Sequence, residues 1–177
     1  MYSGTFGPEE EYRKIGHFYA DVDRILRLPD DELTSIRSGV SGWAVAQHIY
    51  HVSKANTIVW KSITRILAKR SPAAPEGEPN RIGRLVFEYG EMRRGVGKAP
   101  DEFQPPAELD LDEVRRWAKK SAGGFLAFSD IAPSFPEDTY RIRHFLLGML
   151  NAREWLSFVR IHSLHHLVII NDILGAD

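Results

Sequence analysis

The sequence predicts an all-α fold, a four-helix bundle in which long crossover connections join some of the helices. Four long segments carry apolar residues at steps of three and four, the spacing of a helix with one buried face. No segment shows a convincing strand pattern. The connections after the second and third segments are long and rich in proline or glycine. A simple up-down bundle with short loops would not need such lengths, so we expect crossover connections.

Two of the helices are expected in the first 70 residues. The first spans residues 9–28, and Pro29 ends it because proline cannot continue a regular helix. The second carries Trp43 through about Lys69, and Ser41 is a plausible N-cap for it. A cluster of prolines and glycine at residues 72–79 then excludes regular helix.

The middle of the chain gives a mixed signal. Residues 80–106 suggest one or two helical turns followed by an irregular connection, of the kind that often forms a lid or a pocket wall. A third long helix is expected from Asp110 to about Phe128, and Glu113 completes a capping-box-like start. The pair Gly123-Gly124 inside this helix predicts a bend or a close contact with another helix.

The last helix follows a short apolar segment, residues 140–150. Asn151, with Glu154 three residues later, marks its start. The chain of 177 residues is long enough to bury a sizeable core, and we expect a single helical domain over residues 1–177.

Composition restricts the function. Apolar residues make up 43% and charged residues 27%, as is ordinary for a globular protein, and the net charge is −1. A nucleic-acid binder would need a basic stripe, so we expect no nucleic-acid partner. The absence of cysteine excludes disulfides and thiolate metal sites. The lack of cysteine also fits a reducing cytoplasm. No stretch approaches the ~18 consecutive apolar residues of a membrane span, so we expect a soluble, cytoplasmic protein without a membrane partner.

Two histidines lie at the centre of the apolar stripe of the last helix. His162 and His166 are four residues apart, which brings their Cβ atoms to within about 5–6 Å on one face. Buried imidazoles cost free energy unless their nitrogens find partners, and one shared metal ion would satisfy both. The alternative is that backbone carbonyls accept hydrogen bonds from them. His165 points about 80° away and is more simply a flanking residue.

A catalytic zinc-type site needs a third protein ligand and an open position. The second predicted helix offers His48 and His51. On a helical wheel His48 lies nearer the apolar centre and His51 nearer the edge, so periodicity alone favours His48 modestly.

At these residues the chain resembles the DinB-like, or YfiT-like, metal-binding bundles. Trp43, His51 and Val52 match a family motif that opens the second helix, and His162 and His166 match a His-x-x-x-His motif on the last helix. The resemblance implies a four-helix bundle. It also implies His51, His162 and His166 as the metal ligands, against the preference of the helical wheel for His48.

Three neutral imidazoles would leave the charge of a divalent ion uncompensated. Such an ion is a strong Lewis acid and can lower the pKa of bound water to about 7. Zn²⁺ or Ni²⁺ suits three nitrogens best, and Mn²⁺ or Fe²⁺ would bind less tightly. Since the ligands must be deprotonated, we expect the affinity to fall as the pH drops through about 6–7.

The family resemblance implies enzymes that use low-molecular-weight thiols, such as thiol S-transferases and a maleylpyruvate isomerase. We therefore expect a metal-dependent hydrolase or thiol-dependent transferase that acts on a small-molecule substrate or thiol. One alternative is a metal- or ligand-binding bundle without catalysis. Another is a plain helical scaffold whose histidines bond to carbonyls.

Further site residues are expected from the middle connection, which would wall the substrate site. They are Glu88, Tyr89, Glu91, Arg93 and Arg94, although each could equally be an ordinary solvated residue.

Two other regions leave alternatives open. His144 either lines the same cavity or forms a local hydrogen bond. The back of the last helix is also apolar, at Ile161, Leu164 and Val168, and must be covered by other helices or by a second subunit. We expect a homodimer.

Overall fold

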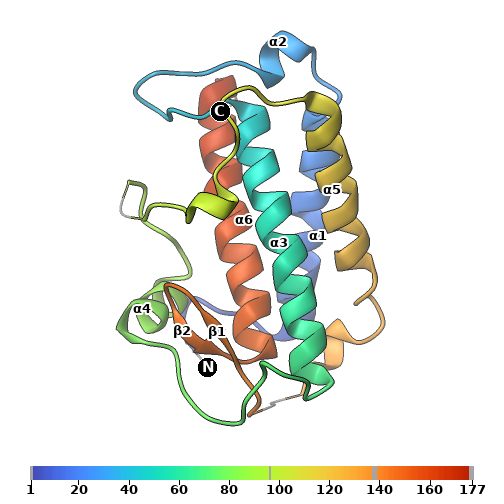
Figure 1. The fold of residues 1–177 in the computed structure, drawn as a ribbon, viewed down its shortest axis with the longest axis vertical. Coiled ribbons are helices and arrows are strands. Elements are labelled where there is room, and N and C mark those ends of the chain that lie inside the picture. The colour runs from blue at the N-terminus through green and yellow to red at the C-terminus, as the bar shows by residue number, and fades with distance from the viewer. Residues whose placement is uncertain (1, 96, 137–138, 176–177) are drawn as a thin grey trace.

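The four long helices α1, α3, α5 and α6 lie side by side along the long axis of the molecule (Figure 1). The computed structural model describes residues 2–95, 97–136 and 139–175. α6 packs against both α1 and α3, and α3 also packs against α5. The protein is therefore mostly helical, as predicted. The bounds of these helices are α1 (Pro8–Ile25), α3 (Val45–Leu67), α5 (Leu111–Leu126) and α6 (Ala152–Leu174).

The order of the helices explains the long connections. In Figure 1, α1 and α6 run upward, whereas α3 and α5 both run downward. Because α3 and α5 point the same way, residues 68–110 must return along the side of the molecule. This return contains α4 (Arg81–Tyr89) and the short 3₁₀ helix η1 (Asp101–Phe103). A shorter connection between α1 and α3 contains the single-turn helix α2 (Asp30–Leu33).

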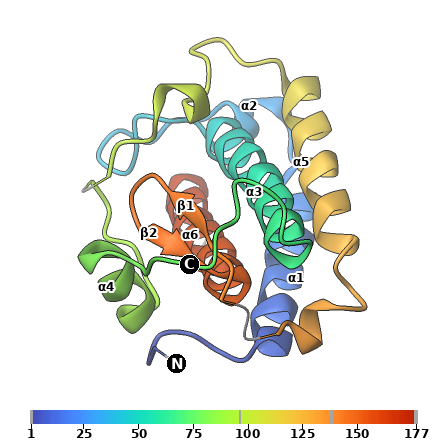
Figure 2. The same ribbon diagram turned by 60° about the horizontal axis from the view of Figure 1, so that its bottom comes forward.

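The segment before α6 is a β-hairpin, so the prediction that the chain contains no strand is wrong here. β1 (Ile142–His144) pairs antiparallel with β2 (Gly148–Leu150), next to α4 in Figure 2. Contacts with residues distant in sequence hold the hairpin. Asn80 N–H donates to Leu147 O at 2.8 Å, and a Cβ at Gly148 would lie 2.5 Å from Asn80 N. Strands of three residues are too short to produce a periodic sequence pattern.

Three local predictions concern the ends of helices and the glycine pair in the third long helix. Asn151 and Glu154 form the predicted capping box: Glu154 N–H donates to Asn151 Oδ1 at 2.9 Å, and Asn151 N–H donates to Glu154 Oε2 at 2.8 Å. Gly124 marks a close helix contact, because a Cβ there would lie 2.7 Å from the Trp60 ring. The N-cap of α3 is Ala44, not Ser41.

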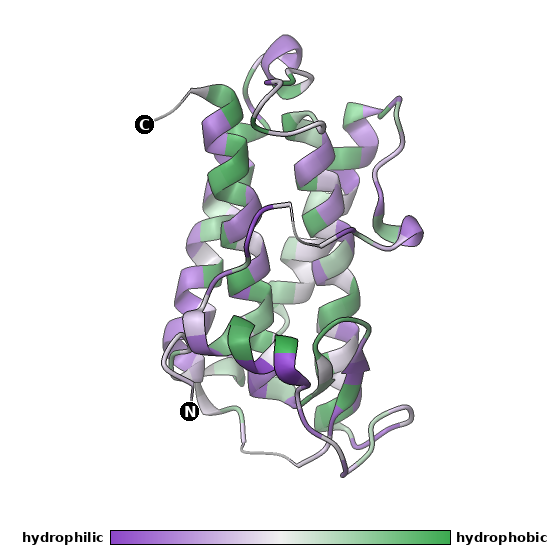
Figure 3. Ribbon diagram, turned by 90° about the vertical axis from the view of Figure 1, so that its left-hand side faces the viewer, coloured by the Kyte–Doolittle hydropathy of each residue, from purple (hydrophilic) through white to green (hydrophobic). Residues whose placement is uncertain are grey.

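The return connection covers the face where α3 and α6 meet. Figure 3 shows it as a mostly hydrophilic segment crossing in front of two helices with long hydrophobic stretches. On the back of α6, Ile161 is buried in the core, whereas Val168 is 51% exposed. In the described part of the chain, no helix combines the length and apolar character needed to cross a bilayer.

Candidate metal centre

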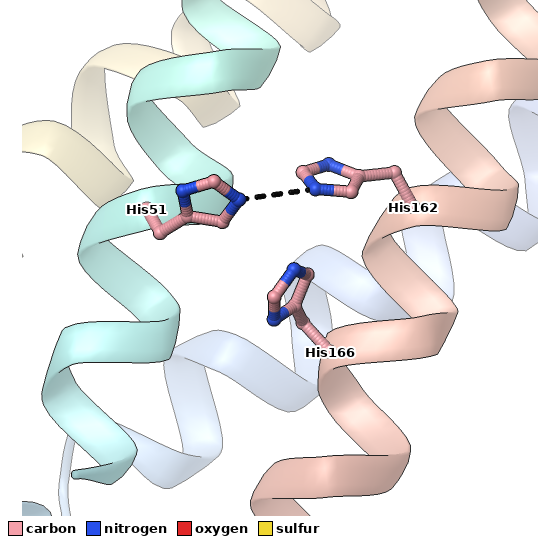
Figure 4. A group of neighbouring side chains, drawn as sticks. All are labelled: His51, His162 and His166. Carbon is pink, nitrogen blue, oxygen red and sulfur yellow. Dashed lines mark hydrogen bonds between the residues drawn. The ribbon is translucent and has the colours of Figure 1, made fainter. Parts of the chain in front are cut away.

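Three histidines from two helices converge inside the molecule. His51 comes from α3, and His162 and His166 come from α6 (Figure 4). One ring nitrogen of each lies within 4.8 Å of the others, and each residue is at most 8% exposed. The structure therefore contains a buried three-histidine cluster that could hold a metal ion.

Helix geometry and helix packing together create the cluster. His162 and His166 share one face of α6 because they are four residues apart, and α3 packs against that face. The ring of Phe158, one turn before His162, stacks on its imidazole at 5.2 Å. Apolar neighbours thus fix the direction of the ring.

The ring nitrogens facing the centre can be identified from the other contacts. Phe103 O accepts from His51 Nδ1 at 2.9 Å, which leaves His51 Nε2 free. His166 Nδ1 lies 2.9 Å from His48 Nδ1, which leaves His166 Nε2 free. His51 Nε2 and His162 Nε2 are 3.1 Å apart. Two nitrogens at 2.0–2.1 Å from one tetrahedral ion would lie about 3.3 Å apart, so this pair needs almost no movement to share an ion.

His48 lies beside the cluster and contacts it through His166. Its Nε2 is 2.9 Å from Ser41 Oγ, which also accepts from Trp43 N–H at 3.0 Å. If His166 Nε2 offers a lone pair to a metal, its Nδ1 carries the hydrogen and donates to His48 Nδ1. His48 Nε2–H then donates to Ser41 Oγ. Ser41 and His48 therefore form a hydrogen-bond chain that orients His166, a common arrangement around metal-binding histidines.

The rings of the cluster are neutral. Burial is the largest cause that lowers the pKa of His51, and it lowers the pKa values of His162 and His166 well below the usual value. Burial, followed by the neighbouring histidines, lowers the pKa of His48 to about 4. Neutral imidazole is the form that binds metal ions.

His162 is the least satisfied of the three rings. Its Nδ1 is buried and has no hydrogen-bond partner among the described residues. Its one polar contact in that part of the chain is His51 Nε2, toward the centre of the cluster. An ion at this centre would bind Nε2, so it would not satisfy Nδ1, whose burial without a partner costs free energy with or without the ion.

A cavity of about 360 Å³ opens beside the cluster and is lined by all three histidines. Its walls include aromatic side chains from several elements, namely Trp43, Phe103, Phe145, Trp155 and Phe158. A volume of this size falls at the lower end of small-molecule sites.

The return connection forms one wall of this cavity, but mostly with residues other than those that the sequence suggested. Of the five expected, only Arg93 lines it. Glu88 accepts instead from Ser3 Oγ at 2.6 Å, and Arg94 pairs with Asp172 at 2.6 Å. His165, expected as a flanking residue, lines the cavity and donates to Met92 O at 3.0 Å. It fastens the connection to α6.

Sequence reasoning missed two partners of the cluster. Phe103 acts through its backbone carbonyl, which carries no sequence signal. Ser41 had a signal, a hydroxyl seven residues before His48, but its position near a helix start favoured an N-cap role. Its contact with His48 is visible only in the folded chain.

Comparison of the chain with protein-family models, with curated proteins and with solved structures finds no match. The likeness to the DinB-like bundles is therefore limited to the short motifs named above. The observations that carry the functional argument are the helical fold and the buried three-histidine cluster.

Proposed function

We propose that the protein binds a divalent metal ion through His51, His162 and His166 and is a metal-dependent enzyme acting on a small molecule in the adjoining cavity. One observation carries this proposal. Three neutral imidazole nitrogens lie within 4.8 Å of one another at the wall of a cavity of about 360 Å³.

The surroundings of the histidines support metal binding more than an ordinary core role. Two of the rings have their second nitrogen held by a hydrogen-bond partner, Phe103 O for His51 and His48 for His166. Such partners fix ring orientation in metal sites. The set of three nitrogens suits Zn²⁺ or Ni²⁺ best and Mn²⁺ or Fe²⁺ less well.

The reaction class follows from the charge of the ligand set. Three neutral ligands do not compensate the charge of a divalent ion, so the ion would be a strong Lewis acid. Such an ion suits hydrolysis or the activation of a thiol. The chain contributes a site that is buried on the helix side and open on the cavity side, so a small molecule can reach a free coordination position. Trp43 and Phe103 are among the aromatic side chains that line this space.

Elemental analysis of untagged protein tests the metal centre. After loading with Zn²⁺ or Ni²⁺ and removal of the excess, we expect about one ion per chain in the wild type and less than about one tenth in His166→Ala, because removal of a ligand abolishes the site. His17 is exposed on α1, so His17→Ala is the matched control and should keep its ion. A wild type that retains less than about one tenth of an ion would refute the metal centre.

A second experiment, on metal-loaded protein, distinguishes an enzyme from a non-catalytic binding module. In the Co²⁺-substituted form, a thiol such as cysteine should change the visible absorption spectrum if a coordination position is open. Turnover in panels of hydrolytic and thiol-transfer substrates, lost in His166→Ala, would establish an enzyme. A spectral change without turnover in either panel would instead favour the non-catalytic metal-binding bundle.

A further inference from the structure

His144 is a buried histidine that lines the cavity but does not belong to the metal cluster. Its Nδ1 accepts two backbone hydrogen bonds, from Leu146 N–H at 3.1 Å and from Leu147 N–H at 3.2 Å. An atom that accepts twice carries no hydrogen, so the hydrogen of this neutral ring is on Nε2. Burial lowers the pKa of His144 to about 4, which keeps the ring neutral. In the described chain, no residue accepts from Nε2–H.

The structure holds this donor in place from several sides. The ring of His144 packs against the rings of Phe145, Trp155 and Phe158 at centroid distances of 4.7, 5.2 and 4.5 Å. Its hairpin is fastened to the start of α4, where Asn80 Nδ2 donates to Leu146 O at 2.8 Å. A ring fixed in this way presents a hydrogen-bond donor without further loss of conformational entropy.

One aromatic ring separates His144 from the metal cluster. Phe158 contacts the ring of His144 on one side and stacks on His162 at 5.2 Å on the other. Phe158 and His162 are four residues apart on α6, which corresponds to about 6 Å along the helix. The cavity therefore has the nitrogen-rich histidine cluster and, beyond an apolar section, the oriented N–H donor of His144. Trp155, which packs against His144, also lines the cavity, and its Nε1–H has no partner among the described residues.

The charged residues around this cavity are mainly basic. Arg93, Lys98 and Arg143 line it and form no ion pair within the described residues, and Glu102 is the one acidic side chain among the described lining residues. All four are exposed to solvent. Such an arrangement attracts anions toward the opening. The apolar section between His144 and the histidine cluster favours a ligand with a hydrocarbon body.

We propose that the cavity binds a small carboxylate with an apolar body, whose carboxylate accepts from His144 Nε2–H while its other end faces His51, His162 and His166. His144 is then the residue that selects the substrate class. For the reaction this inference rests on the proposed function, but binding of the carboxylate is measured without turnover.

Isothermal titration calorimetry on the metal-loaded protein tests the proposal with two probes, hexanoate and hexanamide. They have the same length and differ in charge. We expect hexanoate to bind at least about 10-fold more tightly than hexanamide, since a hydrogen bond to a charged group contributes about 1.5–3 kcal/mol. Added salt should weaken hexanoate binding and leave hexanamide binding nearly unchanged.

The decisive variant is His144→Asn. Asparagine Oδ1 takes the position of His Nδ1 and can still accept from Leu146 and Leu147, while the Nε2–H donor is lost. We expect hexanoate affinity to fall by about 10-fold or more with metal content unchanged. Arg143→Gln should give a smaller, salt-dependent loss. Arg65→Gln removes the same charge from an exposed site outside the cavity and should have no effect.

Three results would overturn the inference or separate it from the metal centre. Equal affinities for hexanoate and hexanamide would overturn the carboxylate assignment. Hexanoate binding that survives His144→Asn but is lost in His166→Ala would also overturn it, because the carboxylate would then sit at the metal centre. A wild type that binds hexanoate through His144 without retaining metal would support this inference and refute the proposed metal centre.

Discussion

Two buried polar groups lie on α6, and they differ in how they are satisfied. Near the start of the helix, Arg160 and Ser157 meet Glu11 of α1, which is 1% exposed. Further along, His162 and His166 meet His51 of α3. Both groups include residues of α6, and both are hidden from solvent.

The Glu11 group is complete within the chain. Its carboxylate accepts from Arg160, from Ser157 Oγ at 2.8 Å and from Phe6 N–H at 3.0 Å, and Arg160 also donates to Gly4 O at 2.6 Å. Opposite charges meet, and each partner stabilises the other. This group therefore has a structural role, fastening the N-terminal segment and α1 to α6.

The histidine cluster, by contrast, is incomplete. Its three rings are of one type, no carboxylate belongs to the group, and His162 Nδ1 has no partner among the described residues. The comparison shows that burial alone does not identify a functional group. A buried polar group whose members satisfy one another is structural, whereas like rings that converge on one point without a counter-charge can hold a cation.

The largest effect on stability is expected at Glu11, in the group that we describe as structural. Glu11→Gln leaves Arg160 buried without its counter-charge, and we expect a loss of about 3–5 kcal/mol in the free energy of unfolding. Urea denaturation of the zinc-loaded protein measures it. Metal content per folded chain should not change.

The control for this experiment is Glu10→Gln. Glu10 is the neighbouring residue, but its side chain is 46% exposed, and its pairs with Arg13 and Lys14 lie on the surface. The expected change is within about 0.5 kcal/mol. If both variants cost the same, the Glu11 group does not stabilise α6 as described.

A smaller effect is expected at the hydrogen-bond chain that orients His166. His48→Phe keeps an aromatic ring but removes the acceptor for His166 Nδ1–H, and zinc affinity should fall by about 10–100-fold. Ser41→Ala should give a smaller loss, because Ser41 contacts His48 and not the ligand. Competition with a chromophoric chelator measures both affinities.

His17→Phe makes the same exchange at an exposed position and should bind zinc like the wild type. If His48→Phe abolishes binding altogether while His51→Ala retains it, His48 is the ligand and His51 is the orienting residue. That result would reverse the assignment made from the geometry.

The last prediction concerns pH and separates the metal-free from the loaded protein. Burial lowers the pKa values of His48 and His144 to about 4 in the folded chain, whereas the unfolded chain has the ordinary value near 6.5. Below about pH 6.5 the unfolded state therefore binds more protons, and stability falls progressively as the pH drops toward 4. Above pH 6.5 this contribution is constant.

Urea unfolding of the metal-free protein between pH 7.5 and pH 5 measures this loss. The zinc-loaded protein should lose less, because the ion holds its ligands deprotonated. Low histidine pKa values also move proton competition with the metal below the pH 6–7 range expected from ordinary histidines. Equal stability of the metal-free protein at both pH values would contradict the burial of these rings.

Much of the site was predictable because it depends on the geometry of single helices. The capping box at Asn151 and the pairing of His162 with His166 follow from spacings of three and four residues. The choice between His48 and His51 did not follow in this way. The helical wheel favoured His48, and the family motif favoured His51. In the structure both rings face α6. His48 contacts Nδ1 of His166, on the side away from the centre of the cluster, whereas His51 contacts Nε2 of His162 at the centre.

The sequence by itself determined the long helices, their apolar faces and the position of the histidine pair within α6, because these depend on interactions between near neighbours along the chain. Only the tertiary structure decided that Phe103 O fixes His51, that Ser41 and His48 orient His166, and that a short hairpin places His144 in the same cavity. The physical reason is that these contacts join residues from separate elements, often through backbone atoms. A local sequence pattern carries no record of such contacts.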